Sequence, residues 1–369
     1  MHPFTILLLG GLALYSLYAL YFLSGLFRLK HREKNDRKPV PSVSVVVAVR
    51  NEASNLPALL TDLADQDYPP DKLEICIIDD RSTDSSWSII QDFSKRFPQI
   101  KGIRITEPSA VMAPKKRALT RGIEKASGEI IVATDGDCRV PATWVTSMVS
   151  AFQPDTGIVV GFSAVNYTDD SFFTRYQRLD FLALMAANAG SLGWGKAWSG
   201  SGQNLAYRRD LFYAVNGFEP VARRNSGDDV YLVQAISDIA GAVFNTSPGS
   251  FVTTAPMASI PAYLNQHIRW TSNFRGLINQ DHFFLLFLLS AFLTNVALLA
   301  GVFIPAVQPI IPAAFSTKFV IDAAVVFYGA NKFLVTVEPL TFIVWSLLQP
   351  VYIPVVGIFG LIGKFRWKE

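Results

Sequence analysis

The stretch IIVATDGDCR, residues 130–139, decides the fold prediction. Its first half is apolar or small and predicts a buried β-strand, which runs into Asp135, Gly136 and Asp137. Two carboxylates this close repel each other, so we expect a cation between them. A hard divalent ion, Mg²⁺ or Mn²⁺, would neutralise both and bridge to a diphosphate. A turn with two solvated acids is the plain alternative.

Strands of this kind alternate with helical segments along the chain, which predicts an α/β domain. The sheet would be parallel, with helices on both faces, and ligands would bind at the carboxyl ends of its strands. Polar clusters follow the strands at that edge: RNE (50–52), DDRSTD (79–84) and DGD (135–137). The expected strands are 42–50, 72–82, 100–107 and 129–137, and the expected helices are 51–66, with Asn51 as its cap, 85–97 and 115–127.

Apolar segments flank this domain and predict membrane helices. Residues 5–27 hold no charged side chain and are long enough to cross a bilayer, which favours an anchor over a removable signal peptide. Further spans are expected at 282–307 and 339–363. The apolar segment 318–333 contains Asp322, so a third span, a re-entrant piece and an interfacial helix all stay open.

The distribution of charge along the chain predicts how its domains are arranged across the membrane. The basic cluster 28–38 places the domain on the cytoplasmic side of a cell (inner) membrane, and the basic end 364–369 suggests the same side, which favours an even number of later spans. The net charge of +3 says little about partners, and we expect no nucleic-acid partner; with two cysteines we expect no disulfide framework. We expect an anchor at 1–28, a linker at 29–41, a cytoplasmic domain at 42–280 and a multi-pass region of two to three spans at 281–369.

Several motifs together resemble the nucleotide-sugar domain of the membrane-bound family 2 glycosyltransferases, which have the Rossmann-like GT-A fold. The resemblance covers residues 42 to about 275. A lone DxD carries little information, but these motifs follow the order of the family. They are VAVRNEA (47–53), IIDDRSTD (77–84), PKKRALTRGIEKASGEIIVATDGD (114–137), SGDDVYL (226–232) and QHIRW (266–270).

The resemblance implies a nucleotide-sugar site at the sheet edge. Asp137 would be the firmer metal ligand and Asp135 would lie near the ribose as well as the metal. Asp80, after Asp79, would accept a hydrogen bond from uracil, although a helix cap explains these acids equally simply. Other residues expected to face the nucleotide sugar are Ala48, Arg50, Glu52, Lys115 and Gln203.

Two further motifs imply catalysis and diphosphate binding. Asp228 and Asp229 are paired acids, which can raise each other's pKa, and the family pattern implies that Asp229 is the general base; a capping box is the alternative. In QHIRW, Arg269 would donate two hydrogen bonds to the diphosphate, beside Trp270 and Gln266. An interfacial helix whose Trp and Arg meet lipid head groups is the alternative.

The resemblance therefore implies an inverting, metal-dependent hexosyltransferase that uses a nucleoside diphosphate sugar, with UDP expected. Family members add one sugar to a lipid, as ceramide and carotenoid glucosyltransferases do, or extend polymers such as poly-N-acetylglucosamine. The small number of expected spans favours a lipid or lipid-linked acceptor over a glycan polymer. A non-catalytic scaffold that only binds nucleotide is the remote alternative.

Overall fold

The computed structural model describes residues 2–30, 40–167, 169–273 and 282–362. The chain forms two compact units. We call residues 29–166 and 192–255 the sheet unit, and residues 1–28, 167–191 and 256–369 the helical unit.

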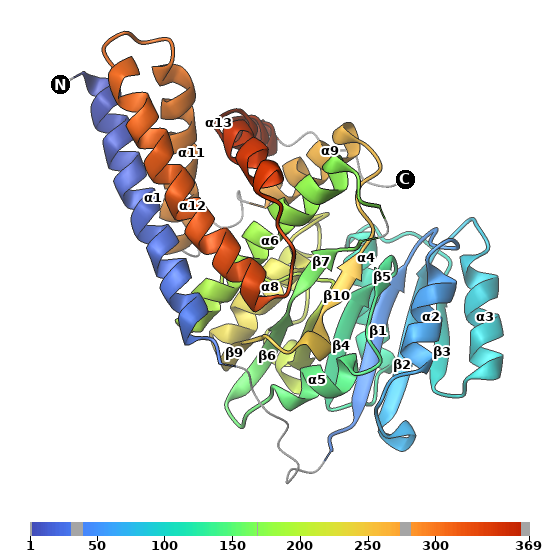
Figure 1. Ribbon diagram of the computed structural model, residues 1–369. Helices are drawn as coiled ribbons and strands as arrows, with labels where there is room; N and C mark the ends of the chain where they lie inside the picture. The colour runs from blue at the N-terminus through green and yellow to red at the C-terminus, as the bar shows by residue number, and fades with distance from the viewer. Residues whose placement is uncertain (1, 31–39, 168, 274–281, 363–369) are drawn as a thin grey trace. The chain divides into compact units, whose positions relative to one another are not determined.

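The sheet unit contains a seven-stranded sheet in the order β3-β2-β1-β4-β8-β6-β9 (Figure 1). The first four strands are parallel, as the alternation of strands and helices predicts. β8 is antiparallel to both of its neighbours, and β6 and β9 are parallel. The strands are β1 Val43–Val49, β2 Leu73–Asp80, β3 Ile100–Ile105, β4 Ile130–Asp135, β6 Thr156–Gly161, β8 Leu205–Arg208 and β9 Gly241–Asn245.

The direction of β8 departs from the predicted all-parallel sheet. Ala133 of β4 pairs with Leu205, and Ile130 pairs with Arg208, so β8 starts where β4 ends. The turn before β8 includes Gly202, whose amide donates to Asp229 at the carboxyl edge of the sheet. The chain thus enters β8 from that edge and has to run back along β4.

A small second sheet, in the order β5-β10-β7, continues from the DGD turn. β10 is antiparallel to β5 and parallel to β7. Because β5 begins directly after Asp137, this pairing holds the far end of the turn. The strands are β5 Cys138–Arg139, β7 Ser163–Val165 and β10 Val252–Thr254.

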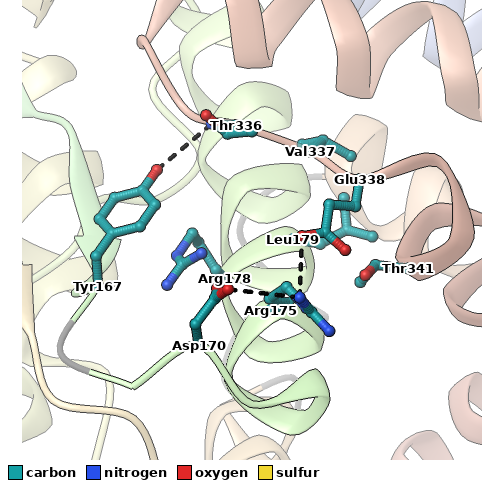
Figure 2. A pocket seen from close by; sticks show the side chains of 9 residues that line it. All are labelled: Tyr167, Asp170, Arg175, Arg178, Leu179, Thr336, Val337, Glu338 and Thr341. Atoms are coloured by element: carbon teal, nitrogen blue, oxygen red, sulfur yellow. Dashed lines mark hydrogen bonds and ion pairs between the residues drawn. The ribbon is translucent and has the colours of Figure 1, made fainter.

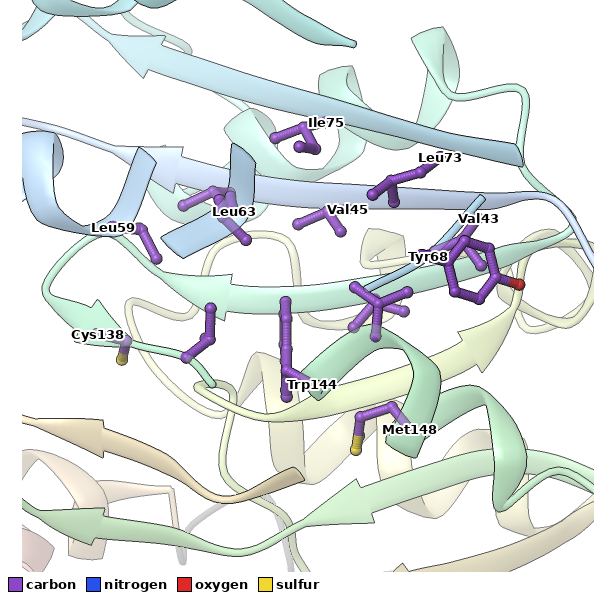
Figure 3. Close-up of a cluster of buried hydrophobic side chains, with 14 of the residues drawn as sticks. Val43, Val45, Leu59, Leu63, Tyr68, Leu73, Ile75, Cys138, Trp144 and Met148 are labelled. Carbon is purple, nitrogen blue, oxygen red and sulfur yellow. The ribbon is translucent and has the colours of Figure 1, made fainter. Parts of the chain in front are cut away.

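Helices cover both faces of the large sheet. Val45 of β1 and Ile75 of β2 face a core that contains side chains of α2, α3 and α5 (Figure 3). Alternate residues face α4, where a Cβ on Gly122 would stand 2.6 Å from Val46 and 2.5 Å from Ile78. The helices are α2 Leu56–Ala64, α3 Ser86–Arg96, α4 Pro114–Lys125, α5 Trp144–Ser150, α7 Arg209–Ala214 and α8 Asp228–Ser237, with short 3₁₀ turns at Pro70–Lys72, Glu219–Val221 and Pro248–Ser250.

One buried amide fixes the start of β8. The Asn204 Oδ1 accepts from Trp144 Nε1 at 2.9 Å, and its Nδ2 donates to the carbonyls of Phe162 (2.8 Å) and Ser250 (2.7 Å). A fully buried amide is stable only when its donors and acceptors are satisfied, as they are here. Asn204 therefore holds the turn that carries Gly202 and Gln203 in one place.

Among the residues that the structure describes, the helical unit contains four helices that are long and apolar enough to cross a membrane: Pro3–Arg28, His282–Gly301, Gln308–Lys332 and Pro339–Ile362. Of these, α1, α11 and α12 lie side by side (Figure 1). The helices are α1 Pro3–Arg28, α6 Phe172–Gly193, α9 Ile260–Ser272, α11 His282–Gly301, α12 Ile311–Lys332 and α13 Pro339–Ile362, with a 3₁₀ turn at Gln308–Ile310.

Within the described residues, three candidate spans follow the domain. The number of true spans and the side on which the chain ends stay predictions. The segment 318–333 belongs to one long helix, α12, in which Asp322 is paired: its Oδ2 lies 2.6 Å from Lys318 Nζ and its Oδ1 accepts from Tyr15 at 2.6 Å. A charge inside an apolar helix is tolerated when it is paired in this way. The basic end 364–369 lies outside the described residues.

We predict that Glu74 stabilises the sheet in a pH-dependent way. Burial alone would raise the pKa of Glu74, but hydrogen bonds from Lys101, Ser44 and Ser127 lower it to about 2. Because the folded-state pKa is depressed, the stabilisation is present above the ordinary pKa of 4.5 and is lost as the pH falls toward 2. Glu74→Gln should lower stability by about 2 kcal/mol and the Tm by about 5 °C at pH 7.

Thermal unfolding of the detergent-solubilised protein between pH 7 and pH 3 checks this prediction. The gap in Tm between wild type and variant should narrow as the pH falls. An equal gap at every pH would contradict the ionic origin of the stabilisation.

Candidate active site

The Lys115 ammonium lies among acids from two elements at the carboxyl edge of the sheet. Its Nζ is 2.7 Å from Asp135 Oδ1 at the end of β4 and 3.6 Å from Asp228 Oδ2 at the start of α8. Burial alone would lower the pKa of Lys115, but Asp135, Asp228 and Asp229 outweigh burial and raise it. A charged lysine therefore supplies a cation beside the DGD turn in the protein itself.

Asp229 is held by two backbone amides and has a raised pKa. Its Oδ2 accepts from the Gly202 amide at 3.0 Å, and its Oδ1 accepts from the Val230 amide at 2.8 Å. Burial, followed by the neighbouring Asp228, raises the pKa of Asp229, and Lys115 partly opposes this. The N-cap of α8 is Gly227, in the left-handed region at φ 79°, without a side-chain cap bond, so the alternative of a capping box is wrong.

Lys116 holds the segment that leads into α8, a role that the sequence did not reveal. Its side chain is 1% exposed, and its Nζ donates to the carbonyls of Arg224 at 2.7 Å and Ser226 at 3.2 Å. Burial lowers the pKa of Lys116. The signal available was the pair of cations at a helix start, where the helix dipole disfavours them.

The glycine of the DGD turn lets β1 and β4 approach closely. A Cβ on Gly136 would stand 2.9 Å from Val49 and 3.2 Å from Glu52. Ala48 lies opposite Asp135 in the strand register. Residues assigned by resemblance to one nucleotide pocket are thus neighbours in the sheet unit.

The donor set at this turn suits a metal ion that the substrate completes. Asp135 and Asp137 are half-buried, and within the described residues no three His, Cys, Asp or Glu side chains are grouped to hold a metal. Magnesium binds through one or two carboxylates plus substrate phosphates more often than in a cage of protein ligands. The residues present fit that arrangement.

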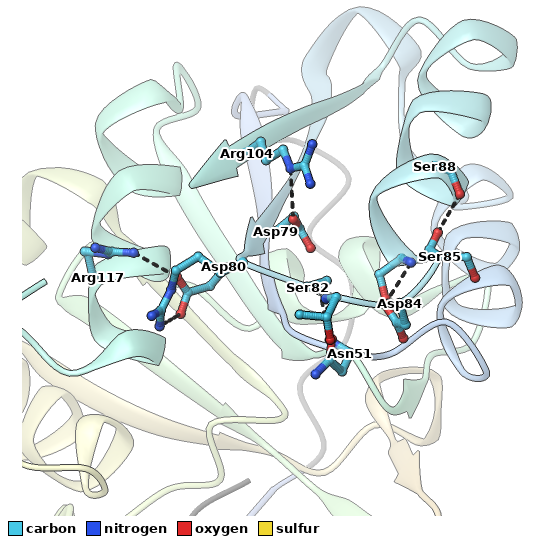
Figure 4. Close-up of polar contacts among 12 residues, drawn as sticks. Asn51, Asp79, Asp80, Ser82, Asp84, Ser85, Ser88, Arg104 and Arg117 are labelled. Atoms are coloured by element: carbon cyan, nitrogen blue, oxygen red, sulfur yellow. Dashed lines mark hydrogen bonds and ion pairs between the residues drawn. The ribbon is translucent and has the colours of Figure 1, made fainter. Parts of the chain in front are cut away.

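At the end of β2, Asp80 is already engaged by guanidinium groups (Figure 4). Arg81 Nε and Nη2 lie 3.0 and 3.2 Å from its two carboxylate oxygens, and Arg117 Nη2 lies 2.8 Å from Oδ1. Each carboxylate oxygen can accept more than one hydrogen bond, so a base N–H would share it with an arginine. Asp79 is fully buried, 3.7 Å from Arg104 Nε, and burial raises its pKa.

The loops after β1 and β2 are tied together by hydrogen bonds. Asn51 accepts from the Thr83 amide at 2.8 Å, and its own amide donates to Ser82 Oγ at 2.9 Å. Asn51 is not the cap of the helix expected at 51–66: it has a positive φ of 55°, and that helix, α2, begins at Leu56. Arg50, beside this loop, is half-buried.

The turn before β8 closes the site on the other side. A Cβ on Gly202 would stand 3.4 Å from Lys115 Nζ and 3.6 Å from Asp229. The next residue, Gln203, is half-buried, and Ser201 Oγ lies 3.5 Å from its Oε1. The sheet unit thus brings together four separate segments of the chain, as the motifs predict: the start of α4, the end of β4, the turn before β8 and the start of α8.

The residues of QHIRW lie on α9, in the helical unit. The Trp270 ring stacks on Phe181 at 5.9 Å and meets the His267 ring at 4.6 Å. Gln266 and Arg269 belong to the same helix. That these residues join the acids of the sheet unit stays a prediction.

The helical unit also contains a small charged pocket of about 260 Å³ (Figure 2). Arg175 lies 3.5 Å from Asp170 and 3.0 Å from Glu338. Arg178 lies 3.6 Å from the ring centroid of Tyr167. The pocket lies beside the connection between α12 and α13, and sequence reasoning did not single it out.

Comparison with known families agrees with the resemblance that the motifs indicate. A sequence model described as "Glycosyl transferase family 2" matches residues 44–215. The chain carries a family 2 glycosyltransferase domain. The predicted family and fold class are thereby confirmed.

Curated relatives resemble the glycosyltransferase domain over part of their length. A probable glycosyltransferase, YdaM of Bacillus subtilis, is 28% identical over 218 residues, 56% of this chain and 51% of that protein. A beta-monoglucosyldiacylglycerol synthase of Nostoc is 30% identical over 151 residues, 41% of this chain and 32% of that protein. The chain thus spans about half or less of the length of these relatives.

A solved structure shares the fold of the whole chain. The mannosyltransferase PcManGT from Pyrobaculum calidifontis aligns with a TM-score of 0.62 at 23% identity. The alignment covers 98% of this chain and 97% of that chain. At this identity the likeness shows the fold alone.

We predict that Lys115→Met lowers turnover of a nucleotide sugar at least about tenfold, because it removes the cation between the acids of the glycosyltransferase domain. Lys115 opposes the upward shift in the pKa of Asp229, so its loss should raise that pKa further. The acid limb of the rate profile should then move to higher pH, because the base must be deprotonated to act.

The measurement is donor turnover against pH for wild type, Lys115→Met and the control Lys125→Met, which changes an exposed lysine at the end of the same helix. The control should match wild type. An unshifted acid limb in Lys115→Met would refute the coupling between Lys115 and Asp229.

Proposed function

We propose that the protein is an inverting glycosyltransferase that moves a sugar from a nucleoside diphosphate sugar to a lipid or lipid-linked acceptor. The observation that carries the proposal is the contact of Lys115 with Asp135 and Asp228, beside Asp229, at the carboxyl edge of a family 2 domain. Ligands bind at this edge in sheets of this kind. The acids are retained and positioned, which a scaffold without catalysis would not require.

In the proposed reaction Asp229 acts as the general base. Its raised pKa brings it nearer to the pH at which proton transfer from a hydroxyl is efficient. Asp229 takes the proton of an acceptor hydroxyl while that oxygen forms a bond to the anomeric carbon. The bond from this carbon to the diphosphate breaks, the nucleoside diphosphate leaves with the electron pair, and the configuration inverts.

A divalent cation, Mg²⁺ or Mn²⁺, fits the residues proposed to hold the donor. Asp137 and Asp135 would bind the metal, which when bound would neutralise charge on the leaving diphosphate. PcManGT was solved with GDP-Man and Mn²⁺, which supports a metal and a nucleotide sugar in this fold. We favour UDP as the nucleotide, with Asp80 facing the base beside Ala48 and Glu52.

Lys115 and the QHIRW residues are proposed to complete the donor site. Lys115 would face the diphosphate once the donor displaces part of its pairing with Asp135. Arg269 would take up charge on the leaving group, since a guanidinium can donate two parallel hydrogen bonds to phosphate oxygens. Gln266 and Trp270 would line the same site.

A lipid acceptor at the cytoplasmic face of the cell membrane is the proposed choice. The candidate spans support a location in a bilayer, and the Nostoc relative is named as a synthase of a glycosylated diacylglycerol. The basic stretch 28–38 after α1 supports a cytoplasmic domain. A polymer product is the competing outcome of the experiment below.

We predict that Asp229→Asn lowers sugar transfer by about 10²–10⁴-fold, because the amide cannot accept the proton. Binding of the nucleoside diphosphate should stay within about threefold of wild type. Release of nucleoside diphosphate and isothermal titration of the same preparation give the two quantities. Full activity of Asp229→Asn would remove Asp229 from the role of base.

We predict that membranes carrying the protein, given lipid and a panel of UDP- and GDP-sugars, form a lipid that is heavier by one sugar. Mass spectrometry of lipid extracts, with and without the gene, identifies donor and acceptor together. EDTA should abolish the product, and added Mg²⁺ or Mn²⁺ should restore it. A released polymer would overturn the lipid acceptor, and no product or nucleotide release with any donor would overturn the enzyme.

A further inference from the structure

A buried carboxylate joins three helices of the helical unit. Asp180 of α6 is 5% exposed, and its Oδ2 accepts from Tyr263 of α9 at 2.7 Å. Its Oδ1 accepts from Trp345 Nε1 of α13 at 2.7 Å. The Nε2 of His267, also on α9, lies 3.1 Å from Oδ2. None of these groups takes part in the reaction proposed above.

The surroundings keep this carboxylate charged. Burial alone would raise the pKa of Asp180, but hydrogen bonds and charge from His267, with Trp345 and Tyr263, lower it. The His267 Nδ1 lies 3.0 Å from the Tyr263 carbonyl, which can only accept, so Nδ1 carries a proton. The ring thus lies between two acceptor oxygens, one on α9 and one on α6.

We call Asp180 and its partners Tyr263 and His267 the clamp. The clamp acts on α9, the helix that also carries Gln266 and Arg269. Successive residues of an α-helix are rotated by about 100°, so Tyr263, His267 and Trp270 share one face of α9. Asp180 binds the first two, and the adjacent Phe181 stacks on Trp270. Gln266 and Arg269 lie on the neighbouring face of α9. Because the helix rotates as one piece, fixing the clamped face also fixes the direction in which this face points.

We propose that Asp180 is a positioning residue for the glycosyltransferase reaction: by binding Tyr263 and His267 it fixes the rotation of α9 and so the direction of Arg269. The inference rests on the proposed function for its effect on rate, although its effect on α9 does not. A buried polar contact of this kind contributes little net stability compared with apolar packing, so its distinctive contribution is a defined geometry.

The test compares Asp180→Asn with Asp322→Asn in the full-length, detergent-solubilised protein. The second variant removes another buried carboxylate of the helical unit, which binds Lys318 and Tyr15 and is not among the partners of α9. Asp180→Asn should lower kcat/KM for the donor at least about tenfold. Asp322→Asn, normalised to folded protein, should stay within about twofold of wild type.

A double-mutant cycle with Arg269→Ala separates positioning from general destabilisation. If Asp180 acts through Arg269, its substitution should cost less than about twofold once Arg269 is absent. Independent, additive losses in rate would overturn the proposal, as would equal losses in Asp180→Asn and Asp322→Asn.

Hydrogen exchange provides a readout that needs no activity. Amides of residues 260–272 should exchange at least about tenfold faster in Asp180→Asn, with α12 unchanged, whereas Asp322→Asn should leave α9 unchanged. If the wild type proves inactive while α9 loosens selectively, the proposed function fails and the clamp stands. Unchanged exchange in α9 would overturn the clamp.

Discussion

The contact between the Lys115 ammonium and acids from β4 and α8 is the interaction on which the site depends. Asp135 and Asp228 come from segments far apart in the chain, and their charges would repel each other at this distance without a cation. Lys116, the next residue, binds the carbonyls just before α8. One short piece of α4 thus neutralises the acids and positions the helix start that carries Asp229.

Around this contact the edge of the sheet is held by close packing and hydrogen bonds. The DGD turn packs against β1 through Gly136, the first two loops bind each other through Asn51, and Asn204 fixes the turn before β8. Catalytic groups must be held closely to act, and here they are held by packed backbone and satisfied hydrogen bonds. The proposed base is accordingly supported by amides of its own helix and of the turn at Gly202.

In the helical unit, too, satisfied polar contacts hold the elements in place, here among apolar helices. Helices that are apolar on all sides have little to fix their rotation, so a few paired polar groups specify it. Asp322 with Lys318 and Tyr15 does this between α12 and α1, and Asp180 with its partners does it between α6, α9 and α13. In both places a buried carboxylate has its partners within the unit.

The sequence by itself determined the first four strands, the acids at their carboxyl ends and the apolar helices, because periodicity and composition are local properties. Only the tertiary structure decided the direction of β8, the left-handed backbone at Asn51, the role of Lys116 and the inclusion of Asp322 in a long helix. Each of these depends on a partner distant in the chain: Asp229 for the turn before β8, Thr83 for Asn51, Ser226 for Lys116 and Tyr15 for Asp322. A local sequence pattern does not indicate which distant residue will be the partner. The free energy that selects the conformation comes from contacts that exist only after folding.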